Sequence, residues 1–474
     1  MRSPIGTIVS AAVIAVTANT VANAGSFSLY TESSAAAIGN YAAGVAAEAA
    51  DASTGWYNPA GLSLLHQRQG VLGLVVVSPS AKLSGISTFS TLGPIPPFRE
   101  RFTDIKGGKM GYVPSGHIAY PVGPNTTFGL SMVAPFGLAT DWDPIGPVRY
   151  QATSSHFITS NLSPELGSRI TEHFAVGAGI DLQFAHVRFN RVLGSPDAMA
   201  AARVSPFTLD SYSNNKGNSF GVGFHAGVLA LFNEDHTRLG VNYQSQMRHH
   251  FYGYSLLQGR LANISPTVSP RSVLAASPAA EFRSDDLESN TVRLPDVTTL
   301  SAYQDVTPKL ALLGSAVYTG WHTLKTIELN RVAAFAPTIG QVFVSSESPQ
   351  HYRDVWRFAL GANYHINPKL MLRVGGGYDE TPTRDEFRDI RVPDSDRWAA
   401  SVGFHYQVKP TIGMDFGYTH LFSTGNARIN RTDSIGASSQ YNVNADVKAH
   451  ANLFGIQAVW TLDQPMVVST KVIG

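Results

Sequence analysis

Side chains that commonly do chemistry are plentiful in this chain of 474 residues, but their spacing does not define an active site. Fifteen histidines and many serines are present, and cysteine is absent, which excludes thiolate catalysis and cysteine metal sites. Neither H-E-x-x-H nor a phosphate-binding loop occurs. Serine hydrolysis needs a Ser, a His and a polar orienting group that meet in space, which spacing alone cannot establish. We predict no enzyme, no cofactor and no metal site.

The charge balance argues against a strongly charged partner. Lys and Arg number 35 and Asp and Glu 34, so the formal net charge at pH 7 is +1. We therefore predict no nucleic-acid partner. Charged residues make up 15% of the chain, below the roughly 25% of soluble domains, whereas Gly and aromatic residues are abundant. Such a composition calls for an architecture in which few charges face water.

The first 24 residues have the three parts of a secretory signal peptide. Arg2 supplies a positive charge, residues 5–16 are apolar, and Ala22–Ala24 form an A-x-A cleavage site. The apolar segment is shorter than the ~20 residues of a membrane-spanning helix. We predict cleavage after Ala24 and export of the mature chain.

From residue 70 onward, apolar residues recur at every second position, which is the pattern of β-strands. In residues 220–232 the apolar face stands opposite Gly and His, and in residues 174–184 it stands opposite Asp181 and Gln183. Residues 397–408 repeat the pattern. These runs are ~9 to 11 residues long, which suits a tilted strand that crosses a bilayer and exceeds the usual ~5 to 6.

Aromatic residues stand at the ends of these apolar faces, as in the girdles of outer-membrane barrels. Examples are Phe220 and Phe232. A soluble sandwich would instead turn charged side chains toward water. Because every backbone group in lipid must be paired, the sheet must close on itself. The predicted fold class is all-β, a transmembrane antiparallel β-barrel in the outer membrane of a Gram-negative bacterium, with His225, His365 and His405 facing the lumen.

The connections between the strands have two sizes. Short ones at residues 306–310 and 366–370 carry turn residues and would be periplasmic. Long polar ones would be irregular extracellular loops: Leu193–Asn218, Leu256–Arg293 and Asp379–Asp396.

A strand at residues 127–134 runs into Pro135, Phe136 and Gly137. Proline cannot donate to a ladder and glycine often marks a bulge, so we expect an interruption there. An ordinary strand end would have the same sequence.

Six segments in collinear order resemble the FadL-type family of outer-membrane transporters of long-chain fatty acids and other hydrophobic compounds. The first, residues 24–65, contains an Asn-Pro-Ala motif at Asn58, Pro59 and Ala60 and is similar to the family's N-terminal hatch. The second, FGLATDW, is similar to the segment at its kinked third strand. The six segments cover nearly the whole mature chain: residues 24–65, 136–142, 217–227, 293–296, 354–364 and 392–406.

The resemblance implies a barrel of about fourteen strands that is plugged by a small, mostly helical hatch. It divides the chain into a signal peptide (1–24), the hatch (25–68), the barrel with its long extracellular loops (69–462) and a C-terminal tail (463–474). It also implies passive transport. Substrate enters from outside, the hatch rearranges, and the substrate leaves sideways through a gate in the wall at Pro135, Phe136 and Gly137.

The resemblance further implies two substrate-binding residues. Arg191 matches by position an arginine that binds the substrate carboxylate, for which a guanidinium offers two parallel donors. Phe27 corresponds to an aromatic residue that reaches the ligand. The family's second cation, a lysine, has no counterpart, because Ser348 or a neighbour falls there, and Lys325 is a substitute only by charge. A solvated loop arginine and a packed phenylalanine are the alternatives.

The predicted function is therefore passive transport of long-chain fatty acids or related hydrophobic compounds. The alternatives are a channel for aromatic or alkane hydrocarbons and, from other classes, a general diffusion porin or a barrel lipase. The expected partners are the hydrophobic substrate, outer-membrane lipid and lipopolysaccharide, and the barrel assembly machinery. We expect the chain to act as a monomer.

Overall fold

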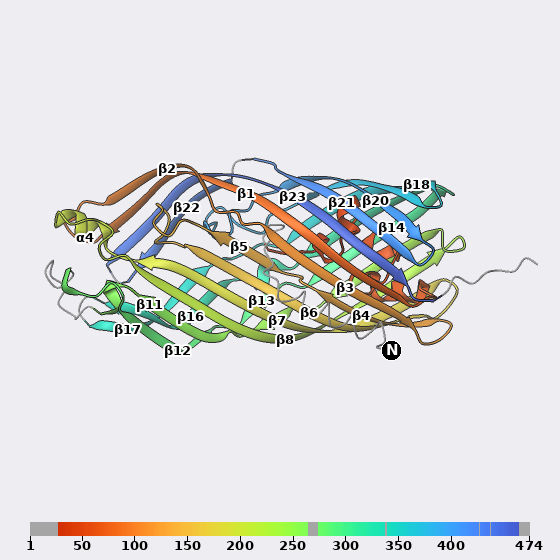
Figure 1. The fold of residues 1–474 in the computed structure, drawn as a ribbon, viewed down its shortest axis with the longest axis horizontal. Helices are drawn as coiled ribbons and strands as arrows, with labels where there is room; N and C mark the ends of the chain where they lie inside the picture. Colours follow the sequence, from red (N-terminus) through yellow and green to blue (C-terminus); the bar gives the residue numbers. More distant parts are fainter. Residues whose placement is uncertain (1–26, 264–273, 337–338, 426, 437, 464–474) are drawn as a thin grey trace, which may run out of the picture.

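The chain forms an elongated barrel of tilted strands with short helices inside one end (Figure 1). The computed structural model describes residues 27–263, 274–336, 339–425, 427–436 and 438–463. The predicted signal peptide and most of the predicted tail lie outside these ranges. In the described part of the chain, no helix is long and apolar enough to cross a membrane.

Fourteen strands close the barrel, as predicted. Each is antiparallel to its neighbours, and the last strand pairs with the first over its whole length. They are β1 (Gln69–Thr91), β3 (Gly111–Pro121), β4 (Thr126–Val133), β6 (Ser154–Arg169), β7 (Phe174–Leu193), β8 (Ser211–Phe232), β9 (Thr237–Gln244), β14 (Val297–Thr307), β15 (Leu310–Thr319), β18 (Val355–Asn367), β19 (Leu370–Asp379), β20 (Arg397–Lys409), β21 (Ile412–Ser423) and β23 (Ser439–Thr461).

Further strands lengthen the wall at the end away from the short turns, where they pair with the outer parts of β1, β6, β8 and β23 or with one another. They are β2 (Phe98–Lys106), β5 (Gly137–Asp141), β11 (Tyr252–Gln258), β12 (Glu281–Ser289), β16 (Thr326–Ala336), β17 (Gly340–Pro349) and β22 (Ala427–Ile435). A separate two-stranded sheet joins β10 (Met247–His249) to β13 (Val292–Leu294).

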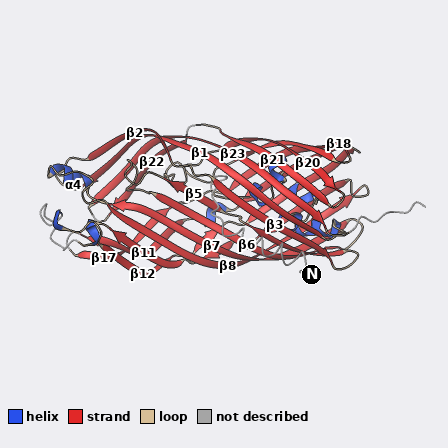
Figure 2. Ribbon diagram, in the orientation of Figure 1, coloured by secondary structure: helices blue, strands red, loops and turns tan. Residues whose placement is uncertain are grey.

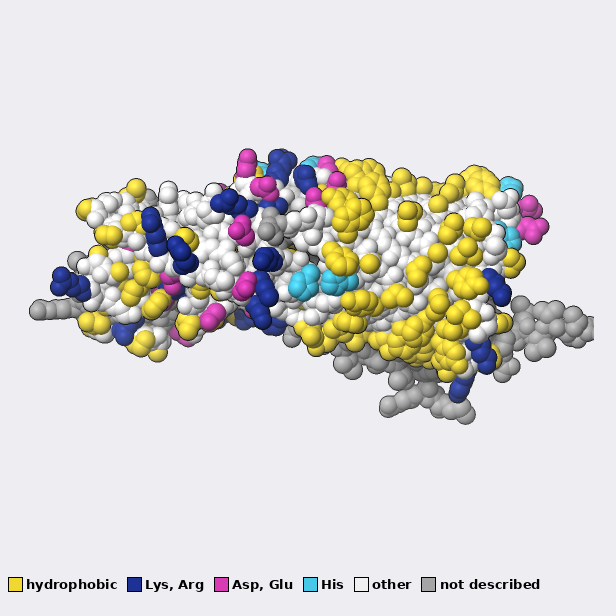
Figure 3. Space-filling model, turned by 90° about the horizontal axis from the view of Figure 1, so that it is seen from above, with side chains coloured by type: hydrophobic (Ala, Val, Ile, Leu, Met, Phe, Trp, Pro, Cys, Tyr) yellow, Lys and Arg dark blue, Asp and Glu magenta, His cyan; other side chains and the backbone are white. Residues whose placement is uncertain are grey.

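The outward face of the barrel carries an apolar band over the half nearer the short turns (Figure 3). On β7, Phe174 and Phe184 mark its two edges and are 48% and 61% exposed. They are ten residues apart, which is about 33 Å along a strand and about 25 Å of height at a tilt of ~40°. On the same strand, Asp181 and Gln183 are buried and face the lumen. The predicted alternation is confirmed, and its span matches the hydrocarbon layer.

Two of the predicted loops are wrong in part, because strands continue beyond the membrane. The first loop begins where β7 ends, at Leu193, as predicted, but β8 already begins at Ser211, with α4 (Pro196–Ala201) between the two strands. The interval from Leu256 to Arg293 contains η4 (Arg260–Ala262) and β12. Outside the membrane both faces of a strand carry polar residues, so the alternation that reveals a strand is lost. The predicted loop from Asp379 to Asp396 is confirmed, because its residues 380–396 form no helix or strand.

The N-terminal part of the described chain, residues 27–68, lies inside the barrel, and we call it the luminal segment (Figure 2). Lumen-facing glycines of the wall allow this close approach. A Cβ added at Gly240 would lie 1.9 Å from the Ala46 carbonyl oxygen, and one at Gly167 would lie 2.1 Å from that of Pro59. The helices of the segment are η1 (Thr31–Ser33), η2 (Ala37–Asn40), α2 (Val45–Glu48), α3 (Thr54–Tyr57) and η3 (Pro59–Leu64).

Candidate ligand cavity and wall interruption

A cavity of about 1480 Å³ occupies the outer part of the barrel, which exceeds the ~300–1,000 Å³ of ordinary ligand pockets. It extends from Phe27, at the start of the luminal segment, to Thr91 and Ser439 at the outer tips of β1 and β23. Most of its wall is aliphatic or aromatic. Lining residues include Phe157, Phe189, Met199, Ile327, Val332 and Val344. Such a space fits a long apolar molecule.

The inner end of the cavity is closed by an aromatic cluster around Phe27. The ring centroid of Phe27 lies 4.8 Å from that of Trp321, 5.2 Å from that of Phe157 and 6.1 Å from that of Phe136. Trp321 belongs to η5 (Trp321–Thr323) and is buried. Phe27 thus lines the cavity and also packs against the segment at Pro135–Gly137.

Arg191 also lines the cavity, near the outer end of β7 and seven residues beyond the edge of the apolar band. It is half-buried, and its guanidinium makes no hydrogen bond or ion pair with any residue that the structure describes. Burial and the neighbouring charge of Arg391 lower the pKa of the Arg191 guanidinium to about 10, although Asp433 acts in the opposite direction. An anion in the cavity would relieve both effects.

Two further cations line the same cavity, and the sequence reasoning missed both. Arg391 comes from the loop 380–396 and bonds to Asp389 at 2.8 Å, and Arg431 comes from β22 and bonds to Asp433 at 2.9 Å. These residues lie far from Arg191 in the sequence, so no spacing pattern connects them. Lys325 is exposed and does not line the cavity, whereas Ser348 does.

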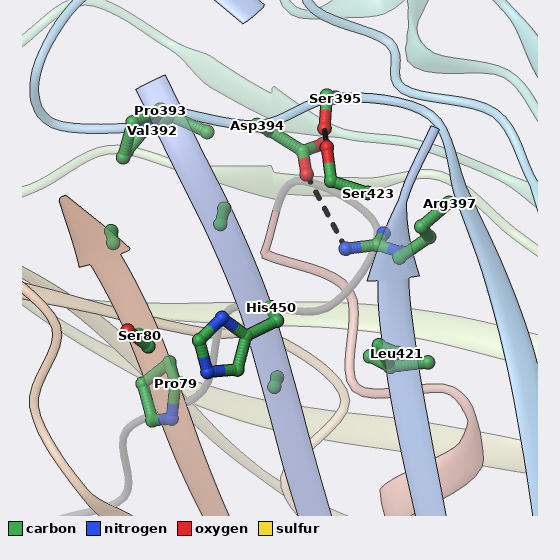
Figure 4. Close-up of a pocket in the computed structure, with 13 residues that line it drawn as sticks. Pro79, Ser80, Val392, Pro393, Asp394, Ser395, Arg397, Leu421, Ser423 and His450 are labelled. Atoms are coloured by element: carbon green, nitrogen blue, oxygen red, sulfur yellow. Dashed lines mark hydrogen bonds and ion pairs between the residues drawn. The ribbon is translucent and has the colours of Figure 1, made fainter. Parts of the chain in front are cut away.

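The loop that carries Arg391 is fixed to the wall on its other side (Figure 4). Arg397 pairs with Asp379 at 2.9 Å and with Asp394 at 3.3 Å, and the hydroxyls of Ser395 and Ser423 are 2.5 Å apart. The space that these residues enclose measures only about 40 Å³, which is room for a water molecule or two. This region positions the loop and offers no space for a ligand.

The wall is interrupted at Pro135–Gly137. β4 ends at Val133 and β5 begins at Gly137, although both pair with β6. Between them the chain pairs with the start of the luminal segment, since Leu29 N–H donates to Pro135 O and Gly137 N–H donates to Phe27 O, both at 2.8 Å. Over the same stretch, residues 111–115 of β3 pair with β1 but not with β4 within the described chain.

The Asn-Pro-Ala motif joins the luminal segment to the wall. Asn58 is fully buried, and its side-chain oxygen accepts from Ala60 N–H at 3.1 Å, which caps η3 with Pro59 in the first position. Its amide nitrogen donates to Ala46 O at 2.7 Å and to Val228 O, in β8, at 3.1 Å. One side chain therefore holds two helices of the segment and a barrel strand together.

The three predicted luminal histidines have different surroundings. His225 is buried and lies 3.0 Å from Asp181 and 3.2 Å from the Gly55 carbonyl oxygen in the luminal segment. His405 is half-buried and lies 3.0 Å from Asp415. His365 is exposed at the end of β18 near the short turn, two residues from Asn363, which donates to Glu48 of the luminal segment.

The stretch from Gly217 to Gly221 reads G-N-S-F-G and matches the G-x-S-x-G pattern, which the prediction of a non-enzyme overlooked. The pattern marks a catalytic serine only on a strand-to-helix turn, whereas Ser219 lies in the middle of β8. Its Oγ is 3.1 Å from His249 Nδ1 and also accepts from His250 N–H. His249 is fully buried and lines none of the cavities described above. The described residues also contain no group of three or more His, Asp or Glu placed to hold a metal ion.

Comparison with known proteins gives a consistent set of matches. Residues 14–462 match the family described as "Outer membrane protein transport protein (OMPP1/FadL/TodX)". "Outer membrane protein P1" of Haemophilus influenzae is 28% identical over 467 residues, which covers 92% of this chain and 95% of that protein. "Long-chain fatty acid transport protein" of Salmonella typhi is 25% identical over 398 residues, which covers 82% and 86% respectively.

Solved structures share the fold. A Pseudomonas aeruginosa FadL homologue superposes with a TM-score of 0.75 at 21% identity, covering 93% of this chain and 100% of the other. The Ralstonia pickettii toluene transporter TbuX gives a TM-score of 0.58 at 17% identity, covering 90% and 99%. At these identities the likeness concerns the fold alone.

Proposed function

Because this chain belongs to the family of outer membrane transport proteins that includes OMPP1, FadL and TodX, we propose that it is a passive channel for long-chain fatty acids. At the level of the family, it is an outer-membrane transporter of hydrophobic compounds and not an enzyme. The choice of fatty acids among those compounds is our proposal. It agrees with the name of the Salmonella typhi relative.

The observation that carries the proposal is the unpaired guanidinium of Arg191 beside an apolar cavity. A half-buried cation without a partner is unfavourable, because its lost hydration is not replaced. A carboxylate accepts two parallel hydrogen bonds from a guanidinium, and an acyl chain would fill the aliphatic wall. Arg391 and Arg431 line the same cavity, but each is paired with an aspartate, and Glu347 and Glu386 line it too. Arg191 is therefore the cation that we assign to the carboxylate. A long-chain fatty acid satisfies both requirements at once.

Uptake of aromatic or alkane hydrocarbons is the second candidate. The apolar lining of the cavity suits a neutral ligand equally well, and the likeness to the toluene transporter TbuX is consistent with it. A hydrocarbon, however, would leave Arg191 without a partner.

The general porin and the barrel lipase have less support. The luminal segment fills the lumen that a porin leaves open. The serine–histidine hydrogen bonds of the described chain, His117–Ser131 and His249–Ser219, face the lumen instead of the outer wall that a lipase would use.

The luminal segment is the proposed hatch, and its first residues are the part we expect to move. Ser28 and Phe136 form a single antiparallel bridge that closes the inner end of the cavity. Three other residues of the segment, Tyr41, Ala42 and Ala49, have φ values of 51° to 58°. Such left-handed conformations cost a non-glycine residue roughly 1 kcal/mol or more each. Relief of this strain would lower the cost of a rearrangement.

The interruption at Pro135–Gly137 is the proposed lateral gate. Beside it, residues 111–115 of β3 pair with β1 but not with β4 within the described chain. Unpaired backbone facing lipid is costly, so we infer that the interrupted wall persists because it has a use. It borders the aromatic cluster around Phe27, so a ligand that breaks the Ser28–Phe136 bridge would reach it. The acyl chain would then pass sideways between β3 and β4 into the membrane.

The remaining partners are also proposals. We propose that the apolar band contacts outer-membrane lipid and lipopolysaccharide, and that the barrel assembly machinery inserts the barrel. A complete lumen and cavity lie within one chain, which supports action as a monomer.

An uptake experiment in a host that lacks its own transporter tests the proposal. The host carries the wild-type chain or Arg191→Ala, and labelled oleate, toluene and a water-soluble sugar are supplied in turn. We expect faster oleate uptake than in the empty host and a marked loss with Arg191→Ala. Acceleration of toluene alone would favour the hydrocarbon channel, and free passage of the sugar would favour the porin.

A further inference from the structure

Three lysines on the outer wall face one another across adjacent strands. Lys82 of β1 is the direct cross-strand partner of Lys106 in β2 and of Lys448 in β23. Neighbouring strands are about 4.8 Å apart, and like charges in opposed positions are destabilising. Lys106 and Lys448 are exposed and Lys82 is partly exposed. None of the three ammonium groups makes a hydrogen bond or ion pair with the residues that the structure describes.

The nearest outward-facing carboxylates have other neighbours. The Asp104 carboxylate accepts from Ser84 Oγ at 3.4 Å. Asp446 is the cross-strand partner of Arg428. Among the described residues no ion pair joins either carboxylate to the lysine row, which points out of the barrel.

The row lies just outside the apolar band. On β23 the outward-facing residues run from Trp460 through Ile456 and Phe454 to His450 and then Lys448. Trp460 and His450 are ten residues apart, the same interval that separates the two aromatic edges of the band on β7. Lys448 is two residues farther, so it lies about 40 Å from Trp460 along the strand, or about 30 Å in height at a tilt of ~40°. This is the level of the outer-leaflet phosphate groups.

The outward-facing rows change from apolar to cationic in steps. Val76 and Phe454 form an apolar row, and Ser78, Asn452 and His420 form the next. Ser80, His450 and Phe422 follow, and then come Lys82 and Lys448. Figure 3 shows the same order, with histidines at the border between the apolar band and the half that carries most charged side chains.

We propose that Lys82, Lys106 and Lys448 form a binding site for the phosphate groups of a phosphorylated glycolipid of the outer leaflet. Its acyl chains would lie along the apolar rows of β1 and β23. Its sugars would face the hydroxyl, amide and imidazole side chains between those rows and the lysines. A ligand with several phosphates matches a row of three cations better than a phospholipid with one. The site is on the outside of the wall and is independent of the cavity.

The test measures binding of bis-phosphorylated lipid A to the purified full chain by native mass spectrometry. The test variant carries Lys82→Gln, Lys106→Gln and Lys448→Gln. The matched control carries Lys309→Gln, Lys369→Gln and Lys409→Gln, three exposed lysines at the short-turn end of the barrel. We expect the dissociation constant to be at least tenfold larger for the test variant and to change less than twofold for the control. Heat-modifiable migration in gel electrophoresis, which differs between folded and heat-denatured barrels, verifies that each variant is folded.

Two further ligands make the outcome decisive. Dephosphorylated lipid A should bind wild type and test variant alike, because it lacks the groups that the lysines recognise. The affinity for phosphatidylglycerol should fall less than threefold in the test variant. Equal binding of bis-phosphorylated lipid A to wild type and test variant would overturn the proposal. An equal loss for phosphatidylglycerol would also overturn it, because it would reduce the lysine row to a general attraction for anions.

Discussion

Replacement of Arg191 by Gln should weaken the binding of a fatty acid without affecting its neutral analogue. Arg191 has no partner among the described residues, so the substitution removes no internal ion pair. A hydrogen bond to a charged group contributes about 1.5–3 kcal/mol, and each 1.4 kcal/mol is a factor of ten in affinity. Oleate should therefore bind about 10- to 150-fold more weakly to Arg191→Gln, whereas oleyl alcohol, which has no carboxylate, should change less than twofold.

The assay is displacement of a fluorescent fatty acid from the purified protein by oleate or by oleyl alcohol. Arg428→Gln is the matched control, because Arg428 is exposed and shares β22 with Arg431 but lies on its outward face. Arg191→Lys should retain part of the affinity, since a lysine keeps the charge but loses the paired donors. Unchanged oleate binding in Arg191→Gln would refute contact with the carboxylate. An equal loss for both ligands would mean that the side chain acts through shape or folding.

Three other substitutions probe the luminal segment and the wall. A Cβ at Gly137 would lie 2.8 Å from Leu29 Cδ1, so Gly137→Glu should place a charge in the exit route and reduce oleate uptake at least tenfold. Gly123→Glu, at a site with open space, should have no effect. Equal uptake by both variants would contradict the gate. Burial raises the pKa of the Glu32 carboxyl from 4.5 to about 7. Because the folded state binds this proton more tightly than the unfolded state, the free energy of unfolding should fall by up to about 3 kcal/mol as pH rises from 4.5 through 7. Glu32→Gln should flatten this fall in thermal unfolding measured between pH 5 and 8, and identical profiles would contradict the assignment. Asn58→Ala removes the donor to the buried Ala46 carbonyl oxygen, at about 1–3 kcal/mol, and the link to Val228 O in the wall. The variant should expose the luminal segment to limited proteolysis, and unchanged resistance would show that Asn58 does not hold the segment in place.

Much of the barrel could be predicted from the sequence, because lipid imposes a rule that is visible residue by residue. The outward face must be apolar and the inward face need not be, so strands such as β7 and β8 stand out within the membrane. Before Phe220 most outward side chains of β8 are polar, and residues 211–218 therefore read as a loop. The turn at Asn58 and Pro59 could also be predicted, because both residues fix the conformation of the chain next to them.

The candidate site was less predictable, because its parts come from distant segments. Phe27, Trp321 and Tyr352 meet only after the barrel closes and the luminal segment enters it. Arg391 reaches the cavity because the loop 380–396 folds inward, and nothing in its local sequence specifies that direction. The pairing of Ser28 with Phe136 likewise depends on the tertiary fold.

A reversible tether between the luminal segment and the wall tests whether transport requires their separation. Ser28 and Phe136 form a non-hydrogen-bonded antiparallel pair, a geometry in which Cα atoms lie about 4.5 Å apart and a disulfide can form. The chain has no cysteine of its own, so Ser28→Cys with Phe136→Cys introduces the only thiols. We expect oleate uptake by this variant to fall to the rate of the empty host when oxidised and to recover on reduction. Equal uptake in the oxidised and reduced states, with the disulfide verified by mass spectrometry, would contradict movement of the luminal segment during transport.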